Sequence, residues 1–309
     1  MLRAGLLWLS EQPHIFRVLR ANGLARRLAS RFVAGETVQS AVAAVRALHT
    51  AGITASLDLL GESVQDAAAA RAARDVYVQT LDTVRAQSHV SLKLTQMGLD
   101  VDEGLCVDNV RAVAARARDH GSFVRIDMEG SAYTERTLAL FQRCFHPEFG
   151  DSVGVVLQSY LRRTERDLGD LLALGARVRL CKGAYQEAPE IAFPDKRDVD
   201  RSYVACMERL LQQGNYPAVA THDPKIITHA KAFARRQGIA LARFEFQMLY
   251  GVRRDLQHAL RREGYNLRVY VPFGDQWYPY LMRRLAERPA NVAFLLGSVL
   301  KESLGRGRA

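Results

Sequence analysis

The segment Tyr280-Leu-Met-Arg-Arg-Leu-Ala-Glu287 combines residue types that could bind a small carboxylate. On a helix, Arg283 and Arg284 would lie three and four residues after Tyr280, so their side chains could approach its ring. Two adjacent guanidiniums repel each other unless an anion lies beside them. Glu287, one turn later, could brace them while leaving donors for a planar carboxylate ligand. The alternative is an arginine-rich surface helix, which is the better interpretation for an Arg-Arg pair taken alone.

The composition is that of a globular protein. The chain has 309 residues, of which 48% are hydrophobic and 25% charged, enough for one large domain or two small ones. No apolar run approaches the length of a membrane span. Residues 1–9 are too short for a secretory signal and lack a small-residue cleavage pattern, although the arginine-rich residues 1–35 weakly resemble a transit peptide. Four widely separated cysteines favour a reducing cytoplasm over a zinc site or disulfide framework.

The net charge of +10 is compatible with nucleic acid, an anionic membrane surface or anionic small ligands. Most of the basic residues are arginines scattered over helical patterns, as in Arg111-Ala-Val-Ala-Ala-Arg-Ala-Arg118. No basic stripe is interleaved with aromatic residues. Solvated helix faces therefore explain most of the charge, and nucleic acid is not an expected partner.

Short apolar runs alternate with amphipathic patterns along most of the chain. The apolar runs predict eight strands, at Ala55–Leu60, His89–Thr95, Phe123–Met128, Val153–Gln158, Arg177–Gly183, Ala218–His222, Phe244–Leu249 and Leu267–Phe273. The amphipathic patterns predict helices at Ala67–Ala86, Asp108–His120, Ala132–Cys144, Glu165–Leu174, Val199–Gln213, Ile226–Gln237 and Val252–Glu263. Eight alternations over about 230 residues indicate an α/β fold of the closed (β/α)8, TIM-type barrel class.

This barrel is expected to occupy residues 51–300. Residues 1–50 are expected to form an N-terminal helical segment, and residues 301–309 a flexible tail. A doubly wound open sheet is the alternative architecture, but no Gly-x-Gly-x-x-Gly turn follows any predicted strand.

Polar residues within buried parallel strands require an explanation, because such strands are normally apolar on both faces. Alternation places one set on a single face of each strand: Lys93; Arg125 and Asp127; Arg177 and Arg179; Glu245 and Gln247; and Tyr270. A period of two directs each set toward the barrel axis, and the last residues of a strand open onto the catalytic face of barrel enzymes. Pairing of charges inside the barrel is the alternative for any one of them. Because cations outnumber Asp127 and Glu245, we expect a cationic mouth.

Eight stretches together resemble the monofunctional bacterial proline dehydrogenases, which are flavoenzymes built on a (β/α)8 barrel. They follow the family's order over roughly residues 30 to 300: Leu57-Asp-Leu-Leu-Gly-Glu-Ser63, Ser91-Leu-Lys-Leu-Thr95, Arg125-Ile-Asp-Met-Glu129, Gln158-Ser-Tyr-Leu-Arg-Arg163, Arg179-Leu-Cys-Lys-Gly-Ala-Tyr185, Ala220-Thr-His-Asp223, Phe244-Glu-Phe-Gln-Met-Leu-Tyr-Gly251 and Tyr280-Leu-Met-Arg-Arg-Leu-Ala-Glu287. Each stretch alone is weak evidence, whereas eight in order are strong.

The resemblance implies a role for particular residues. The carboxylate of L-proline would be held by Lys93, Arg283 and Arg284, with the two arginines braced by Glu287. Asp127 would lie near Lys93 and Arg284 and order the site. The pyrrolidine ring would be surrounded by Tyr270, Tyr280 and Leu249. Arg179 would contact the flavin near N5, and the remaining contacts to FAD would come from Met128, Gln158, Lys182, Gly183, Ala184, Tyr185, Thr221 and His222.

The resemblance also implies an activity. The enzyme would oxidise L-proline to 1-pyrroline-5-carboxylate by hydride transfer from C5 to flavin N5, the first step of proline catabolism to glutamate. A cation near N5, such as Arg179, would raise the electron affinity of the flavin. The substrate amine must be unprotonated, so activity should rise toward alkaline pH. The expected partners are a quinone electron acceptor, with peripheral association at the inner face of the cell membrane, and a separate 1-pyrroline-5-carboxylate dehydrogenase downstream.

Two other classes of function compete with this interpretation. Lys93 or Lys182 could be the nucleophile of a Schiff-base barrel lyase, because lysines at strand ends also suit imine chemistry. A basic scaffold could bind nucleic acid or a membrane without catalysis. A metal site is not expected, because His222 has no second histidine at ligand spacing.

Overall fold

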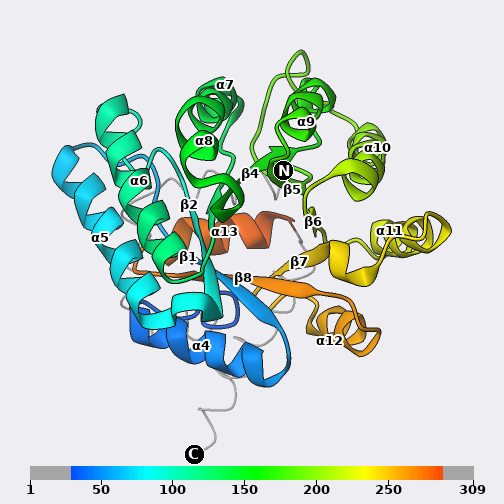
Figure 1. The fold of residues 1–309 in the computed structure, drawn as a ribbon, viewed down its shortest axis with the longest axis horizontal. Helices are drawn as coiled ribbons and strands as arrows, with labels where there is room; N and C mark the ends of the chain where they lie inside the picture. The colour runs from blue at the N-terminus through cyan, green and yellow to red at the C-terminus, as the bar shows by residue number, and fades with distance from the viewer. Residues whose placement is uncertain (1–28, 288–309) are drawn as a thin grey trace, which may run out of the picture.

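A closed barrel of eight parallel strands forms the centre of the protein (Figure 1). The computed structural model describes residues 29–287. Each strand pairs with its neighbours in the sequence, and β8 closes the barrel by pairing with β1. The strands are β1 (Thr54–Leu59), β2 (Ser88–Leu92), β3 (Val124–Ile126), β4 (Val153–Gln158), β5 (Arg177–Cys181), β6 (Ala218–Ala220), β7 (Glu245–Leu249) and β8 (Leu267–Phe273). The predicted (β/α)8 barrel is therefore confirmed.

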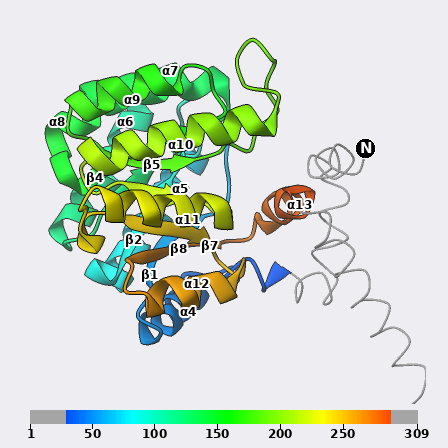
Figure 2. The ribbon, with the colours of Figure 1, turned by 90° about the vertical axis from the view of Figure 1, so that its right-hand side faces the viewer.

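Helices cover the outside of this barrel. They are α4 (Val38–Thr50), α5 (Ala67–Val84), α6 (Glu103–Asp119), α7 (Ser131–Leu140), α8 (His146–Phe149), α9 (Thr164–Ala173), α10 (Lys196–Gln213), α11 (Pro224–Arg236) and α12 (Arg254–Arg262). A further helix, α13 (Trp277–Glu287), follows β8. Figure 2 shows α10 and α11 along the side of the barrel, whereas α13 lies apart from them beyond one end. Within the N-terminal segment predicted to be helical, residues 1–50, the structure describes the helix α4. The part of this segment before residue 29 and the predicted tail at 301–309 lie outside the described residues.

Side-chain caps explain where several helices begin. The hydroxyl of Thr37 accepts a hydrogen bond from the backbone N–H of Ser40 at the start of α4. Asp66 and Asp102 accept equivalent bonds at the starts of α5 and α6. Such side-chain oxygens satisfy N–H groups that have no partner within the helix. Each cap ends the loop that carries the chain from the mouth of the barrel back to its outer layer.

Several strands are shorter than predicted at their carboxyl ends. The strand predicted to run to Thr95 ends at Leu92, and the one predicted to run to His222 ends at Ala220. Lys93, Asp127 and His222 therefore lie in the first residues after a strand. The backbone N–H of Asp127 donates a hydrogen bond of 2.9 Å to the carbonyl oxygen of Leu92. Beyond this bond, the chain after β3 leaves the sheet and turns toward the helical layer. Polar residues in these loops face the cavity without breaking the apolar outer surface of the sheet.

The two faces of the sheet differ in polarity. Outward-facing residues such as Leu57, Val90 and Val155 are fully buried against the helices. The inner face is polar, and its lower end, which we call the barrel floor, contains the side chains of Arg125, Arg177, Glu245 and Arg268. Gly154 leaves room for this layer, because a Cβ atom there would lie 2.5 Å from a terminal nitrogen of Arg125.

The floor corrects one expectation about charge. Glu245 was expected at the mouth, but it begins β7 and accepts two bonds from Arg268 Nε, at 3.0 and 3.1 Å. Burial alone would raise the pKa of Glu245, yet the guanidinium of Arg268 holds that pKa below its ordinary value. Glu245 is thus an ionised partner within the barrel and not part of the mouth.

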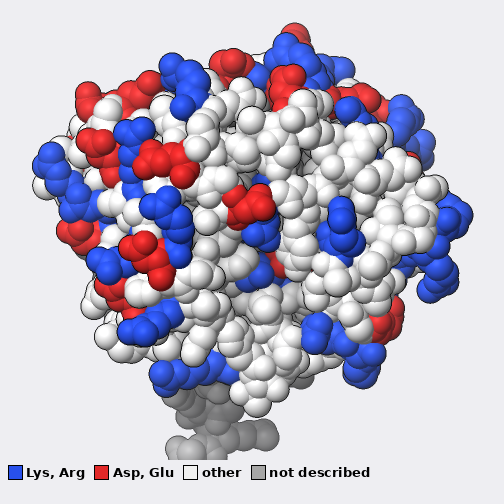
Figure 3. Space-filling model, viewed as in Figure 1, with Lys and Arg blue, Asp and Glu red and all other residues white. Residues whose placement is uncertain are grey.

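Surface charge is mixed on the face shown in Figure 3. Lys and Arg side chains are interspersed with Asp and Glu around this face and form no single basic stripe. Within residues 29–287, none of the helices has the length and apolar character needed to cross a membrane.

Candidate active site

A cavity of about 1170 Å³ lies at the carboxyl ends of the strands. Its walls bring together residues that are far apart in the sequence, from Asp58 to Arg284, as alternation and the family motifs predicted. The lining includes Lys93, Asp127, Met128, Gln158, Arg179, Lys182, Gly183, Ala184, Tyr185, Thr221, His222, Leu249, Tyr270, Tyr280 and Arg284. Arg283 and Glu287 belong to α13, but their side chains are outside what the structure describes.

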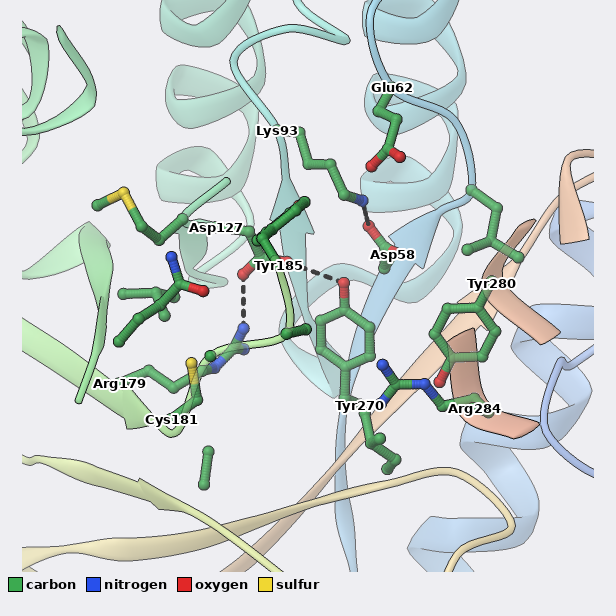
Figure 4. A pocket seen from close by; sticks show the side chains of 18 of the residues that line it. Asp58, Glu62, Lys93, Asp127, Arg179, Cys181, Tyr185, Tyr270, Tyr280 and Arg284 are labelled. Atoms are coloured by element: carbon green, nitrogen blue, oxygen red, sulfur yellow. Dashed lines mark hydrogen bonds and ion pairs between the residues drawn. The ribbon is translucent and has the colours of Figure 1, made fainter. Parts of the chain in front are cut away.

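Asp127 is the centre of one polar cluster in this cavity (Figure 4). Its Oδ1 atom accepts a hydrogen bond of 2.6 Å from Arg179, and its Oδ2 atom accepts one of 2.8 Å from the hydroxyl of Tyr270. Burial, reinforced by the charge of Asp127, raises the pKa of Tyr270 well above its ordinary value, so this hydroxyl remains a donor. Both carboxylate oxygens are therefore engaged, and Asp127, which follows β3, connects this strand to β5 and β8.

Lys93 forms an ion pair with Asp58, a residue that the sequence interpretation missed. Their Nζ and Oδ1 atoms are 3.3 Å apart, and Asp58 is only 1% exposed. Burial raises the pKa of Asp58 to about 6, although Lys93 opposes the shift. Burial would lower the pKa of Lys93, but the attraction of Asp58 outweighs it and raises that pKa. An ammonium group held in this way is a poor Schiff-base nucleophile, which argues against the lyase hypothesis for Lys93.

The signal for Asp58 was present in the sequence. It is a carboxylate between two leucines in a strand, and it has the same inward alternation that identified Lys93. The register then places Asp58 opposite Ser91, two residues before Lys93 on the neighbouring strand. Figure 4 shows the two side chains meeting at the cavity wall, with Glu62 beside them.

α13 supplies the part of the wall that was predicted from the segment Tyr280–Glu287. The guanidinium carbon of Arg284 lies 5.1 Å from the centre of the Tyr280 ring, four residues earlier. Both side chains point into the cavity next to Tyr270 (Figure 4). The start of the helix is fixed by Trp277, whose Nε1 atom donates to Glu36 at 3.0 Å. The predicted helix and the approach of Tyr280 to Arg284 are confirmed.

Lys182 belongs to a second charged cluster on the wall. Its Nζ atom lies 2.6 Å from Asp200 and 3.0 Å from Asp223. Asp200 also binds Lys196, and Asp223 caps the start of α11. The two carboxylates hold the Lys182 side chain between α10 and α11. Asp200 was not predicted, because it lies on α10, outside the strand ends and the motifs from which site residues were predicted.

A buried carboxylate behind the wall links three loops to the end of β4. Glu129 accepts bonds from the backbone N–H and the hydroxyl of Thr95, at 3.1 and 2.6 Å. Thr95 Oγ1 in turn accepts from the N–H of Ser63, and the amide of Gln158 donates to the carbonyl oxygen of Glu129. The loops after β1, β2 and β3 are thereby fastened to one another and to the last residue of β4. Burial raises the pKa of Glu129, a residue that the sequence interpretation used only as part of a motif.

Backbone approaches shape the remainder of the cavity. Gly183 has a φ of +113°, and a Cβ atom there would lie 2.2 Å from the ring of Tyr160. His222 Nε2 accepts a 2.8 Å bond from the N–H of Leu249, which in the neutral ring leaves the proton on Nδ1. Among residues 29–287, no group of three or more His, Cys, Asp or Glu side chains could hold a metal ion.

The charge of the mouth is more balanced than expected. The described lining has six cations, Lys93, Arg179, Lys182, Lys196, Arg253 and Arg284, and five carboxylates, Asp58, Glu62, Asp127, Asp223 and Asp275. Most of these carboxylates come from loops and helix starts, which strand alternation does not detect. The cations are therefore largely held by neighbouring carboxylates.

Comparison with known proteins gives a consistent assignment. The proline dehydrogenase family model matches residues 41–296. The chain is 42% identical to proline dehydrogenase 2 of Bacillus subtilis (strain 168) over 96% of this chain and 98% of that protein. It is also 42% identical to the proline dehydrogenase of Deinococcus radiodurans, over 97% and 98% of the two chains.

The fold has solved counterparts. The chain is similar to proline utilization A from Bdellovibrio bacteriovorus inactivated by N-propargylglycine, with a TM-score of 0.81 and 26% identity over 89% of this chain. It spans 34% of that longer chain. The barrel, the conjunction of motifs at its mouth and the extent of the sequence match all agree, and the chain belongs to the proline dehydrogenase family.

Proposed function

We propose that the protein oxidises L-proline to 1-pyrroline-5-carboxylate with FAD, the first step of proline catabolism to glutamate. The observation that carries the proposal is the convergence of Lys93, Arg179 and Arg284 on one cavity at the catalytic end of a family barrel. Aromatic and apolar side chains line the same cavity. This arrangement suits a small amino acid that has a carboxylate at one end and an apolar ring at the other.

The residues present fit a flavin. The cavity exceeds the range of about 300–1,000 Å³ that is typical for drug-sized ligands, which leaves room for a dinucleotide as well as a small substrate. Gly183 provides a wall without a side chain, and polar groups suited to a ribityl and diphosphate chain are present at Lys182, Thr221 and His222. Arg179, Gln158 and Met128 would lie along the ring system. When bound, the flavin would accept the hydride that leaves C5 of proline.

The substrate would be oriented by its carboxylate. Lys93 and Arg284 would hold this group, with Arg283 and Glu287 completing the clamp. Tyr270, Tyr280 and Leu249 would pack around the ring. Fixing the remote carboxylate restricts the position of C5, and orientation of this kind supplies a large share of catalysis when a cofactor does the chemistry.

Asp127 would organise the site and not remove a proton. Arg179 and Tyr270 already occupy its two oxygens. The proton on the ring nitrogen would therefore be lost to solvent before reaction, and the nitrogen lone pair would form the imine as the hydride departs. Turnover should consequently increase with pH as the neutral amine becomes more abundant.

An anaerobic titration tests the proposal. The purified protein should be yellow, and L-proline should bleach its flavin absorbance in the absence of oxygen. Arg284→Ala should retain the flavin but lower kcat/KM for proline by at least about 30-fold, because truncating one partner of a buried charged contact costs about 2 kcal/mol or more. A bound flavin that L-proline leaves oxidised would contradict the proposal.

For the later steps, we propose a quinone acceptor at the membrane surface and a separate dehydrogenase for the product. The net charge of +10 supports peripheral attachment to anionic lipid. Reduced enzyme should be reoxidised by a soluble quinone. The protein should also sediment with vesicles that contain phosphatidylglycerol but not with phosphatidylcholine vesicles. If the protein sediments with neither type of vesicle, peripheral attachment is contradicted, but the proposed oxidation of L-proline is not.

A further inference from the structure

A hydrogen-bonded column runs inside the barrel from the floor to the mouth. It consists of Arg268, Glu245, Gln247 and Arg179, which are 8%, 3%, 4% and 6% exposed and so nearly inaccessible to water. Arg268 donates to Glu245, Glu245 accepts from the Gln247 amide, and Gln247 accepts from Arg179. Alternation along β7 predicts that Glu245 and Gln247 face inward, but it predicts no role for either residue.

The orientation of the Gln247 amide is determined by its two neighbours. Its Oε1 atom accepts from Arg179 Nε at 2.5 Å, and its Nε2 atom donates to Glu245 Oε1 at 2.5 Å. In a flipped amide, the NH2 group would face the N–H of Arg179 Nε, and the amide oxygen would face the carboxylate of Glu245. Neither contact could form a hydrogen bond. Glu245 is itself held by Arg268 Nε, and the Nη1 atom of the same guanidinium donates to the carbonyl oxygen of Ala55 at 2.8 Å. The amide therefore has one stable arrangement, with its oxygen toward Arg179.

Gln247 completes the support of the Arg179 guanidinium. The two terminal nitrogens donate to Asp127 at 2.6 Å and to Ser91 at 3.0 Å, and Nε donates to Gln247. Each of the three nitrogens is thus held by a different strand or strand end. Without Gln247, the guanidinium could pivot about its bonds to Asp127 and Ser91, and Nε would remain buried with no acceptor from β7.

We propose that Gln247 is a positioning residue for Arg179 and thereby raises the reduction potential of the flavin. The inference rests on the proposed function, in which Arg179 lies near flavin N5. A cation fixed beside N5 stabilises the negative charge that arrives on reduction, and a fixed charge does so more effectively than a mobile one. Gln247 lines the cavity, but both polar atoms of its amide are directed to Arg179 and Glu245.

The test compares two substitutions in flavin-loaded protein. Gln247→Met and Gln247→Leu both remove the acceptor for Arg179, keep the side-chain volume approximately, and place no second carboxylate against Glu245. Both should shift the equilibrium between oxidised and reduced flavin about tenfold toward the oxidised form. This corresponds to a midpoint potential about 30 mV lower for a two-electron couple. The potential is measured by dye equilibration under anaerobic conditions, together with flavin content and thermal unfolding.

Two further variants make the result specific. Asn109→Leu removes another buried amide, which donates to the carbonyl oxygen of Met97 on the outer side of the barrel, and should leave the potential unchanged. Arg179→Lys should lower the potential by altering the cation itself. Wild-type potentials in both Gln247 variants, with a shifted value in Arg179→Lys, would overturn the role of Gln247 and leave the proposed function intact. An unchanged potential in Arg179→Lys would overturn the flavin contact and this inference with it.

Discussion

Asp58 is a cavity residue whose charge should respond to pH near neutrality. Its pKa is raised to about 6 by burial, so it takes up a proton as the pH falls from 8 to 5.5. That proton removes a negative charge 3.3 Å from Lys93, and Lys93 can then attract a ligand carboxylate more strongly. Cyclopentanecarboxylate, which lacks the ring nitrogen of proline, should therefore bind about tenfold more tightly at pH 5.5 than at pH 8.

Removing the charge permanently should remove this pH dependence. Asp58→Asn is expected to bind cyclopentanecarboxylate at pH 8 as tightly as the wild-type protein does at pH 5.5. Asp275→Asn, which alters an exposed carboxylate of the same cavity, should keep the wild-type dependence. Calorimetric titrations of oxidised protein at several pH values measure the effect. An unchanged pH slope in Asp58→Asn would show that another group is responsible.

At the scale of elements, the sequence predicts which segments form strands better than where the strands end. All eight strands were found, because apolar runs of this length between amphipathic patterns are distinctive. Lys93 and His222, by contrast, were placed within strands and lie in loops. Strand ends depend on where the neighbouring strand stops offering hydrogen-bond partners, and that is a property of the assembled barrel.

The same distinction separates the predicted from the missed site residues. Alternation and family motifs predicted Asp127, Arg179 and Arg284, each within a recognisable stretch. Alternation along one strand indicates that Asp58 faces inward, but its pairing with Lys93 arises from the register between β1 and β2. Pairings across strands set the partners of each charge, and one strand read alone does not reveal them.

The loop after β5 gives a prediction at this scale. Gly183→Ala should shift the loop, because the added Cβ atom would lie 2.2 Å from the ring of Tyr160 and φ is +113°. Strain and overpacking of this kind each cost about 1–3 kcal/mol. We expect the dissociation constant for FAD to rise at least about tenfold, measured by titrating apoprotein with FAD and following flavin fluorescence.

Gly175, at the other end of the same strand, provides the matched control. Its φ is +71°, but no heavy atom lies within 4 Å of the position that a Cβ atom would take. Gly175→Ala should therefore cost about 1–2 kcal/mol of folding stability from the left-handed backbone while leaving FAD affinity unchanged. Equal loss of FAD affinity in both variants would attribute the effect to general destabilisation and not to the cavity wall.

For the whole molecule, the barrel separates the layer that stabilises the fold from the layer that binds ligands. The floor contains several buried guanidiniums, and burial together with neighbouring guanidiniums lowers the pKa of Arg125. Arg125 donates to the backbone carbonyl oxygens of Val155 and Arg177 and lies over the ring of Phe123. These contacts are tightly packed around β4, at the opposite end of the barrel from the cavity.

Gly154 tests whether that packing governs stability without affecting the site. In Gly154→Ala the new Cβ atom would lie 2.4 Å from the carbonyl oxygen of Arg177 and 2.5 Å from the Arg125 guanidinium, so the floor must expand. Overpacking should lower the free energy of unfolding by about 1–3 kcal/mol and the melting temperature by about 2–10 °C, while FAD affinity remains at the wild-type value. Gly169→Ala, within α9 and 3.7 Å from its nearest neighbour, should instead stabilise the protein by up to about 1 kcal/mol. Thermal unfolding followed by circular dichroism measures both changes. A loss of FAD affinity in Gly154→Ala would show that strain at the floor reaches the mouth. The column through Gln247 would be one route for this strain.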